Sequence, residues 1–360
     1  MSQLVEILNE RVERVRVTLA WGATERKMFY DLCANFIADG VPVYEAIEEI
    51  GKRWEAQRNP KAQITNSLLS GFRGQGGTAL RFGQAMQEWA PSMEAMAIDA
   101  GEQSGDIVNG LRMASRLTEV TARIRGTLIG EMMYPAFLLL LFGAFLYMLS
   151  TAVMPVFADI LPREKWPTGA RILGALADAA PWLYGGLLLF IVTLLGAFSW
   201  SKGPWVGDVR SFFDQWVPPW SIQRQVSGAI LMTCFAVLTK AGIPFSAVIA
   251  KLSVTASAWD LSHLNLMRSK MRRGMRDGDA MAGPLFDEDV RWEIGVYGRL
   301  TSFSSALESL SVRVVERVIK KIQMFAGILR NLIMFAIAGM IVWVYGTFFT
   351  ITMAVKQATH

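Results

Sequence analysis

Two carboxylates, Glu102 and Asp106, stand among glycines in the run DAGEQSGDI at residues 99–107. An acidic turn of this kind can dock a partner or bind a metal ion. The alternative is a corner between two helices, in which the glycines let the backbone turn and Ser104 or Asp106 caps the next helix. A corner explains the glycines and Ser104 but gives Glu102 no role. We favour the corner and keep docking or metal binding by Glu102 and Asp106 as the second hypothesis.

A basic run, RSKMRRGMR, occupies residues 268–276. Its simplest interpretation is a solvated helix face. Arg268, Arg272 and Arg273 are also candidates to contact an acidic partner surface or anionic membrane lipids. Because the run lies well before the last apolar segment of the chain, a partner is the preferred functional alternative.

Two further segments resemble functional motifs. The run GFRGQGG at residues 71–77 lacks the Gly-Lys-Ser/Thr ending that places a lysine and a hydroxyl group on phosphates, so a loop between helices is predicted. Residues 4–17 form an amphipathic pattern, which indicates a helix that packs on its own bundle, lies on the membrane or binds a partner. Packing on its own bundle is the default interpretation.

Histidine and cysteine are too few and too scattered for a catalytic or zinc site. His263 and His360 lie far apart in the sequence, and Cys33 and Cys234 each lie in an apolar helical pattern, which predicts buried free thiols. No Ser/His/Asp set can be assembled from the spacing either. We therefore predict that the chain is not an enzyme and holds no metal or cofactor.

The composition indicates a membrane protein with large water-facing parts. Of 360 residues, 52% are hydrophobic and 19% are charged, and the mean hydropathy is +0.31. The net charge of +5 is typical of Lys and Arg at cytoplasmic membrane flanks, so no nucleic-acid partner is expected.

Three apolar stretches are long enough to cross a bilayer, and the Lys and Arg residues near their ends predict the orientation. Ionisable residues are nearly absent from these stretches, which argues against a pore, a pump or a small membrane transporter. The predicted order is a cytoplasmic bundle at 1–131, a span at 132–157, a periplasmic loop at 158–181, a span at 182–200, a second cytoplasmic bundle at 201–327, a span at 328–355 and a periplasmic tail at 356–360.

The two predicted cytoplasmic regions look like copies of one domain. Their apolar residues recur at helical spacing, so the predicted fold is all-α: two repeated helical bundles joined by three transmembrane helices. The matched features are the turns Gly40-Val-Pro42 and Gly242-Ile-Pro244, the runs Gly83-Gln-Ala-Met86 and Gly278-Asp-Ala-Met281, and the residues Arg123 and Arg317.

This order of motifs resembles the type II secretion F-domain family, the inner-membrane platform proteins of type IV pilus and type II secretion machines. The resemblance rests on the Gly-x-Pro turn, the Gly-x-Ala-Met run, the GEQSG run from Gly101 to Gly105 and the apolar span that follows. The second copy departs from the pattern in WEIGVYGRL: Gly295 and Gly298 remain, but Val296 replaces the acid and one residue is lost. That degenerate half and the short chain resemble the type IVb branch.

The resemblance implies a platform in the inner membrane with its N-terminus in the cytoplasm. It implies docking of a hexameric assembly or retraction ATPase, transfer of prepilin or minor pilin subunits, contact with alignment-complex inner-membrane proteins, and a homo-oligomer. ATP hydrolysis would take place in the partner. A type II secretion platform is the nearest alternative. A transporter would need polar residues at the membrane midplane, and a membrane sensor or enzyme regulator would need a catalytic or nucleotide-binding site.

Overall fold

The computed structural model describes residues 16–18, 20–74, 78–299 and 303–358, and in these ranges it is helical without strands. This confirms the all-α class. His360 and most of the amphipathic segment at 4–17 lie outside the described residues. So do the last three residues of the glycine-rich run at 71–77. The chain forms two compact units, one of Met1–Arg125 with Gly203–Val318 and one of Gly126–Lys202 with Ile319–His360.

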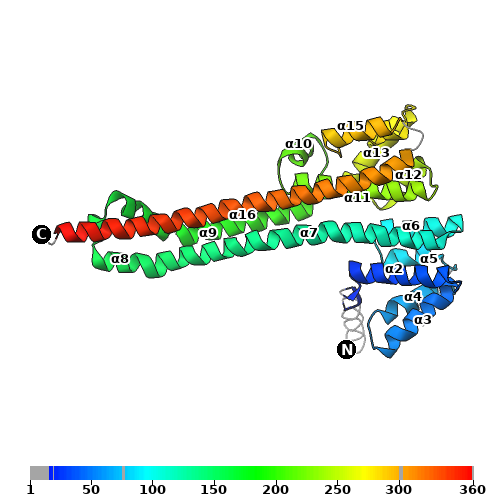
Figure 1. Ribbon diagram of the computed structural model, residues 1–360, viewed down its shortest axis with the longest axis horizontal. Coiled ribbons are helices and arrows are strands. Elements are labelled where there is room, and N and C mark those ends of the chain that lie inside the picture. The colour runs from blue at the N-terminus through cyan, green and yellow to red at the C-terminus, as the bar shows by residue number, and fades with distance from the viewer. Residues whose placement is uncertain (1–15, 19, 75–77, 300–302, 359–360) are drawn as a thin grey trace, which may run out of the picture. The chain divides into compact units, whose positions relative to one another are not determined.

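The first unit holds both copies of the repeated domain (Figure 1). The helices of the first copy are α2 (Ala23–Ala38), α3 (Val43–Ala56), α4 (Ala62–Phe72), α5 (Phe82–Ala85) with the 3-10 turn η1 (Met86–Glu88), α6 (Ser92–Ser104) and the start of α7 (Ile107–Met148). Those of the second are α11 (Trp220–Lys240), α12 (Phe245–Thr255), α13 (Ala258–Arg272), α14 (Asp277–Met281), α15 (Glu288–Tyr297) and the start of α16 (Phe303–Ala358), preceded by α10 (Asp208–Trp216).

Both copies make the same turn after their first helix. Gly40 and Gly242 have φ angles of 91° and 81°, a conformation that glycine adopts without steric strain. The next amide donates back to the carbonyl five residues earlier, over 2.9 Å in the first copy and 3.1 Å in the second. Pro42 and Pro244 then occupy the N-cap positions of α3 and α12. Equal geometry at equal places is what an internal duplication requires.

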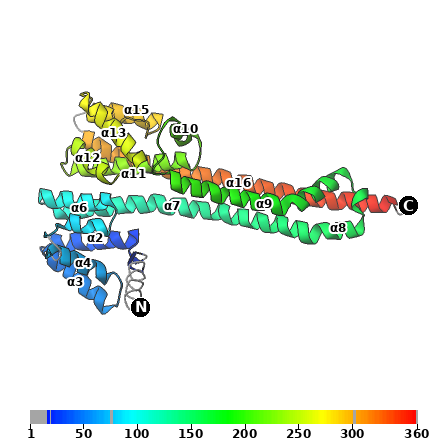
Figure 2. The same cartoon turned by 180° about the vertical axis from the view of Figure 1, so that it is seen from behind.

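Each copy builds its own apolar core around its first helix. In the first copy, the ring of Phe29 on α2 lies 5.8 Å from the ring of Trp54 and 6.4 Å from that of Phe82, measured between centroids. Figures 1 and 2 show that α2 lies along α7. In the second copy, Phe235 of α11 stacks on Phe245 of α12 at 4.4 Å. Buried aromatic rings of this size dominate the energetics of a small helical domain.

The second unit contains the end of α7, the π-helical turn η2 (Leu149–Val153), α8 (Met154–Ile160), the 3-10 turn η3 (Arg163–Lys165), α9 (Thr168–Ser201) and the rest of α16. The periplasmic loop over 158–181 stays a prediction; within that range the structure is largely helical, and α9 begins at Thr168. The reason is a small apolar core in which the first turns of α9 pack on α8 and on Ile351 of α16. Trp166 lies under Gly174 and donates from Nε1 to the Leu161 carbonyl at 2.6 Å.

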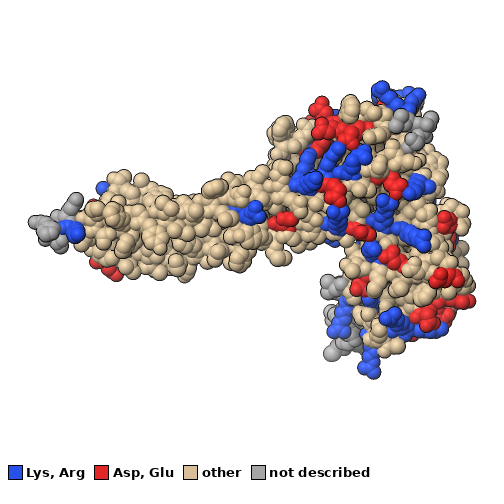
Figure 3. Space-filling view, in the orientation of Figure 1, with Lys and Arg blue, Asp and Glu red and all other residues tan. Residues whose placement is uncertain are grey.

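Four helical segments of the described chain are long and apolar enough to cross a membrane: Ile107–Ile160, Thr168–Ser201, Trp220–Lys240 and Phe303–Met353. Three was the predicted number, and it stays a prediction. The most apolar window of Trp220–Lys240 is 61% buried inside the protein, whereas the corresponding windows of the other three are at most 22% buried. Figure 3 shows charged side chains gathered over the first unit and sparse on the second. The predicted borders at 131/132 and 327/328 fall inside the unbroken helices α7 and α16.

Candidate partner-docking site

The acidic run forms a corner between α6 and α7. Gly105 takes a φ of +78°, and the amide of Asp106 donates to the Gly101 carbonyl at 2.8 Å, which closes α6. The Asp106 side chain accepts from the Asn109 amide at 3.0 Å and so caps α7. A Cβ atom on Gly101 would lie 2.5 Å from Gly110 Cα, so the two helices cross too closely for any side chain there. These contacts account for Asp106 and both glycines without a ligand.

Glu102 also has an internal partner. Its Oε2 atom accepts from the amide of Gly83, the second residue of α5, over 3.3 Å. A carboxylate at that place satisfies an amide that the helix itself leaves unpaired. Gly83 in turn lies against the backbone of α6, where a Cβ atom would be 2.4 Å from Asp99 Cα. The Gly-x-Ala-Met and GEQSG motifs, far apart in the sequence, are therefore one packed structure.

Asp99, at the start of the same run, reaches both copies. Its Oδ1 atom lies 2.9 Å from Arg81 Nη2 and its Oδ2 atom lies 3.5 Å from Lys251 Nζ of α12. The side chain is mostly buried, with 14% exposed. Asp99 was not among the sequence candidates, because nothing in the sequence shows that α12 of the second copy approaches α6.

The basic run lies at the C-terminal end of α13. Arg272 and Arg273 are exposed and Arg268 is half-buried. Over the described part of the chain, none of the three side chains has a hydrogen bond or ion pair, and none contacts Glu102 or Asp106. Lys270, between them, instead turns inward and donates from Nζ to the carbonyls of Asp279 at 3.3 Å and Ala282 at 2.7 Å. The arginines of this run thus remain available to a partner, whereas the acids of the corner are used internally.

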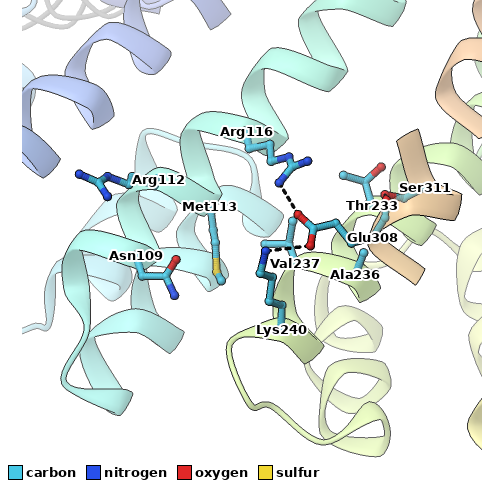
Figure 4. A pocket seen from close by; sticks show the side chains of 10 residues that line it. All are labelled: Asn109, Arg112, Met113, Arg116, Thr233, Ala236, Val237, Lys240, Glu308 and Ser311. Carbon is cyan, nitrogen blue, oxygen red and sulfur yellow. Dashed lines mark hydrogen bonds and ion pairs between the residues drawn. The ribbon is translucent and has the colours of Figure 1, made fainter. Parts of the chain in front are cut away.

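A cleft of about 150 Å³ lies where the two copies meet, lined by α7, α11 and α16 (Figure 4). Glu308 bridges two cations across it: Arg116 Nη1 of α7 at 2.7 Å and Lys240 Nζ of α11 at 2.8 Å. Hydrogen bonds from Lys240 and then Arg116 lower the pKa of the Glu308 carboxyl below its ordinary value. Arg112, on the cleft wall, points away from Glu308.

Similar pairs connect α7 and α16 further along. Arg123 Nη1 lies 2.6 Å from Glu316 Oε1, so the partners advance in the same direction from Arg116 and Glu308. The steps are seven residues on α7 and eight on α16, close to the spacing at which parallel helices keep one face together. The two copies are therefore joined by equivalent helices running parallel.

The structure gives no support to metal binding at the acidic corner. Within the described ranges, no group of three or more His, Cys, Asp or Glu side chains is placed to hold an ion. His263 packs edge-on against Trp259 at 4.6 Å, and burial followed by the charges of Arg224 and Arg210 lowers its pKa to about 4. Cys33 and Cys234 are both buried free thiols.

Comparison with known proteins bears on these features. The family profile of protein F of the type II secretion system matches residues 29–155 and 231–351, segments that begin in α2 and in α11. The toxin coregulated pilus biosynthesis protein E of Vibrio cholerae serotype O1 is 23% identical over 330 residues, which is 91% of this chain and 95% of that protein. The profile covers more than half of the sequence in two segments that follow the duplication, and the long apolar helices fit a multi-pass membrane protein. The chain belongs to the type II secretion system protein F family.

Proposed function

We propose that this chain is an inner-membrane platform protein for assembly of a type IV pilus, of the type IVb branch. One observation carries the proposal: the family profile matches both copies, and a pilus biosynthesis protein matches nearly the full length of the chain. The duplicated helical domain, with apolar helices leaving each copy, is the anatomy that a cytoplasmic platform on a membrane anchor needs.

The proposed partners follow from what each part exposes. A hexameric ATPase docks on the basic end of α13, where Arg268, Arg272 and Arg273 have no partner among the described side chains. Prepilin or minor pilin subunits and alignment-complex proteins contact the apolar helices of the second unit, and the platform works as a homo-oligomer. Glu102 and Asp106 hold the corner in shape and do not touch the ATPase directly.

The mechanical part of the proposal rests on helix continuity. Helices α7 and α16 pass from the first unit into the second without a break, and ion pairs at Glu308 and Glu316 join them. A rotation of the copies driven by ATP hydrolysis in the partner would therefore travel along both helices into the membrane. In this topology the N-terminus is cytoplasmic, the C-terminus is periplasmic, and α11 remains inside its bundle while three helical segments span.

Photo-crosslinking in intact cells tests the docking surface. A photoreactive amino acid is placed at Arg272, at Glu102 and, as a control, at the exposed Gln57 of the first copy. We expect capture of the ATPase from position 272 alone. If the ATPase were captured from position 102 and not from position 272, its docking site would be the corner between α6 and α7. If it were captured from neither position, docking on α13 would be refuted.

The phenotype of cells that lack this chain distinguishes a pilus platform from a type II secretion platform. Cells lacking this chain are compared with complemented cells for surface pilus fibres and for proteins released to the medium. The proposal requires loss of fibres with secretion intact. Loss of secreted proteins with fibres intact would establish the alternative.

A further inference from the structure

Helix α10 buries two charged residues and exposes three large apolar residues. Arg210 and Asp214 have only 1% and 4% of their surface exposed. Val209, Phe212 and Trp216 on the same helix are 64%, 57% and 73% exposed. Soluble helices place these residue types the other way round, so the outer face of α10 is not built for water.

The buried face is held firmly by its own bundle. Arg210 Nε lies 2.9 Å from Asp214 Oδ1, and its Nη2 atom donates to Gln223 Oε1 at 2.8 Å. Asp214 also accepts from Trp259 Nε1 at 2.9 Å, and its carbonyl accepts from Arg224 Nε at 2.9 Å. Removing this many bonds to charged groups would be costly, so α10 cannot roll over to hide its apolar face.

The exposed residues form one stripe. At about 100° per residue, Val209, Phe212 and Trp216 fall within about 60° of one another around the helix axis. Val206, two residues before the helix, is also 48% exposed. Ser211 lies about 130° from the middle of the stripe and is exposed on another side of the helix.

The chain holds α10 close to a membrane-spanning helix. Helix α9 ends at Ser201 and α10 begins at Asp208. Seven residues span at most about 25 Å even when fully extended, which is comparable to the depth of the headgroup region plus one helix diameter. Trp200, at the last turn of α9, is 81% exposed, in the place where tryptophan marks a membrane boundary.

From these observations we propose that α10 lies in the headgroup region of the bilayer at the Ser201 end of α9, with Val206, Val209, Phe212 and Trp216 inserted among the lipid chains. The inserted stripe carries no charge, so binding depends on apolar burial and is independent of anionic lipid. The inverted helix then fixes the second copy to the membrane surface, while the first copy has no equivalent element among its described helices. The inference requires only that α9 spans, and it does not depend on docking of an ATPase or on the choice of secretion machine.

Depth-dependent quenching tests the inference on the full chain. Cys33 and Cys234 are replaced by alanine, and a single cysteine is introduced as Val209→Cys, Phe212→Cys, Trp216→Cys or, as the matched control on the same helix, Ser211→Cys. Each variant is labelled with an environment-sensitive fluorophore and reconstituted in phosphatidylcholine vesicles with a lipid spin-labelled on its acyl chain. All four sites are exposed, and circular dichroism with thermal unfolding checks that each variant folds.

We expect quenching at positions 209, 212 and 216 to be at least threefold greater than at 211, and unchanged when one-third of the lipid is phosphatidylglycerol. Equal quenching at all four positions would overturn the inference. A blue-shifted but unquenched label at 212 and 216 would also overturn it, because a protein surface would then cover the stripe. Quenching seen only with phosphatidylglycerol would refute the charge-independent insertion.

Discussion

The two copies in the first unit keep the same turns but use different buried polar contacts. In the first copy, Arg26 of α2 binds Glu94 of α6 in a bidentate pair, with distances of 2.8 and 3.1 Å. In the second, Arg224 of α11 binds Asp287, the N-cap of α15, at 2.5 Å. Arg26 precedes Gly40 by fourteen residues and Arg224 precedes Gly242 by eighteen, so the arginine is displaced by about one helical turn. A link between the first helix and the start of α6 or α15 is present in both copies, although its position differs.

The glycine contacts differ in the same way. Gly83 of α5 packs on the α6 backbone at Asp99, whereas Gly278 of α14 packs on Gly298, where a Cβ atom would lie 2.3 Å from the Gly298 Cα. Glu102, which accepts a hydrogen bond from the Gly83 amide, has no acidic counterpart in the second copy, where Val296 takes its place and is 43% exposed. Both copies therefore need a residue without a side chain on the short helix, and in the second copy the facing Gly298 has no room for a side chain either, because its Cβ atom would lie 2.5 Å from Gly278 Cα.

The largest expected effect comes from breaking either buried arginine pair. Glu94→Ala leaves Arg26, whose side chain is 14% exposed, without its carboxylate, and we expect a loss of about 3–5 kcal/mol in unfolding free energy. Asp287→Ala should cost less, because Arg224 keeps the carbonyls of Pro284, Leu285 and Asp214. Thermal unfolding of the purified chain in detergent measures both. Glu48→Ala, which removes an exposed pair with Lys52, is the control and should change stability by less than about 0.5 kcal/mol. Equal losses at Glu94 and Glu48 would contradict the comparison.

The second prediction concerns the glycines of the short helices α5 and α14, Gly83 and Gly278. Gly83→Ala and Gly278→Ala place a methyl group against backbone in each copy, and each should destabilise the chain by about 2 kcal/mol. Gly295→Ala has open space and lies inside α15, so it should be neutral or stabilise by up to about 1 kcal/mol. Thermal unfolding and membrane accumulation distinguish the three variants. A destabilising Gly295→Ala would show that the second corner still depends on that glycine.

A smaller effect is confined to the second copy and depends on pH. The pKa of His263 is lowered from about 6.5 to about 4 in the folded chain, so the unfolded chain binds the proton first as pH falls. The contribution of neutral His263 is complete above pH 6.5 and is lost progressively towards pH 4, on the order of 1–2 kcal/mol after allowing for its partial exposure. His263→Gln should flatten this part of the pH–stability curve. An unchanged curve would mean that other groups cause the acid sensitivity.

The smallest effect concerns the contact between the copies. Glu308→Gln removes the charge that Arg116 and Lys240 share, and at a partly exposed site we expect a loss of about 1 kcal/mol or less. Because the folded pKa of Glu308 is lowered, its contribution is present above the unfolded pKa near 4.3 and is lost as pH falls through the folded value. Adding 0.5 M salt should mimic the substitution in the wild-type chain and leave Glu308→Gln unchanged. If the stability of the wild-type and Glu308→Gln chains depended equally on salt, the charges that salt screens would lie away from Glu308.

The all-α class and the duplicated Gly-x-Pro turns were readable from the sequence because they are local. Gly40 and Pro42 act through their own backbone, and helical spacing of apolar residues needs no distant partner. The start of α9 at Thr168 was not readable, because its first turns pack in one apolar core with Ile351, far along the chain. The basic run could be located, but only the structure shows that Lys270 turns inward while Arg272 stays free of side-chain partners within the described residues.

By itself, the sequence determined that this chain is a helical membrane protein with a repeated domain, since composition, hydropathy and local turn chemistry suffice for that. The tertiary structure decided what Glu102 does, because its partner Gly83 lies nineteen residues earlier and is brought near only when α5 packs on α6. It also decided the orientation of α10: the mixture of polar and apolar residues is visible in DVRSFFDQW, but only packing shows that Arg210 and Asp214 face inward. Burial is a property of neighbours that no residue determines alone, and neighbours are set by the fold.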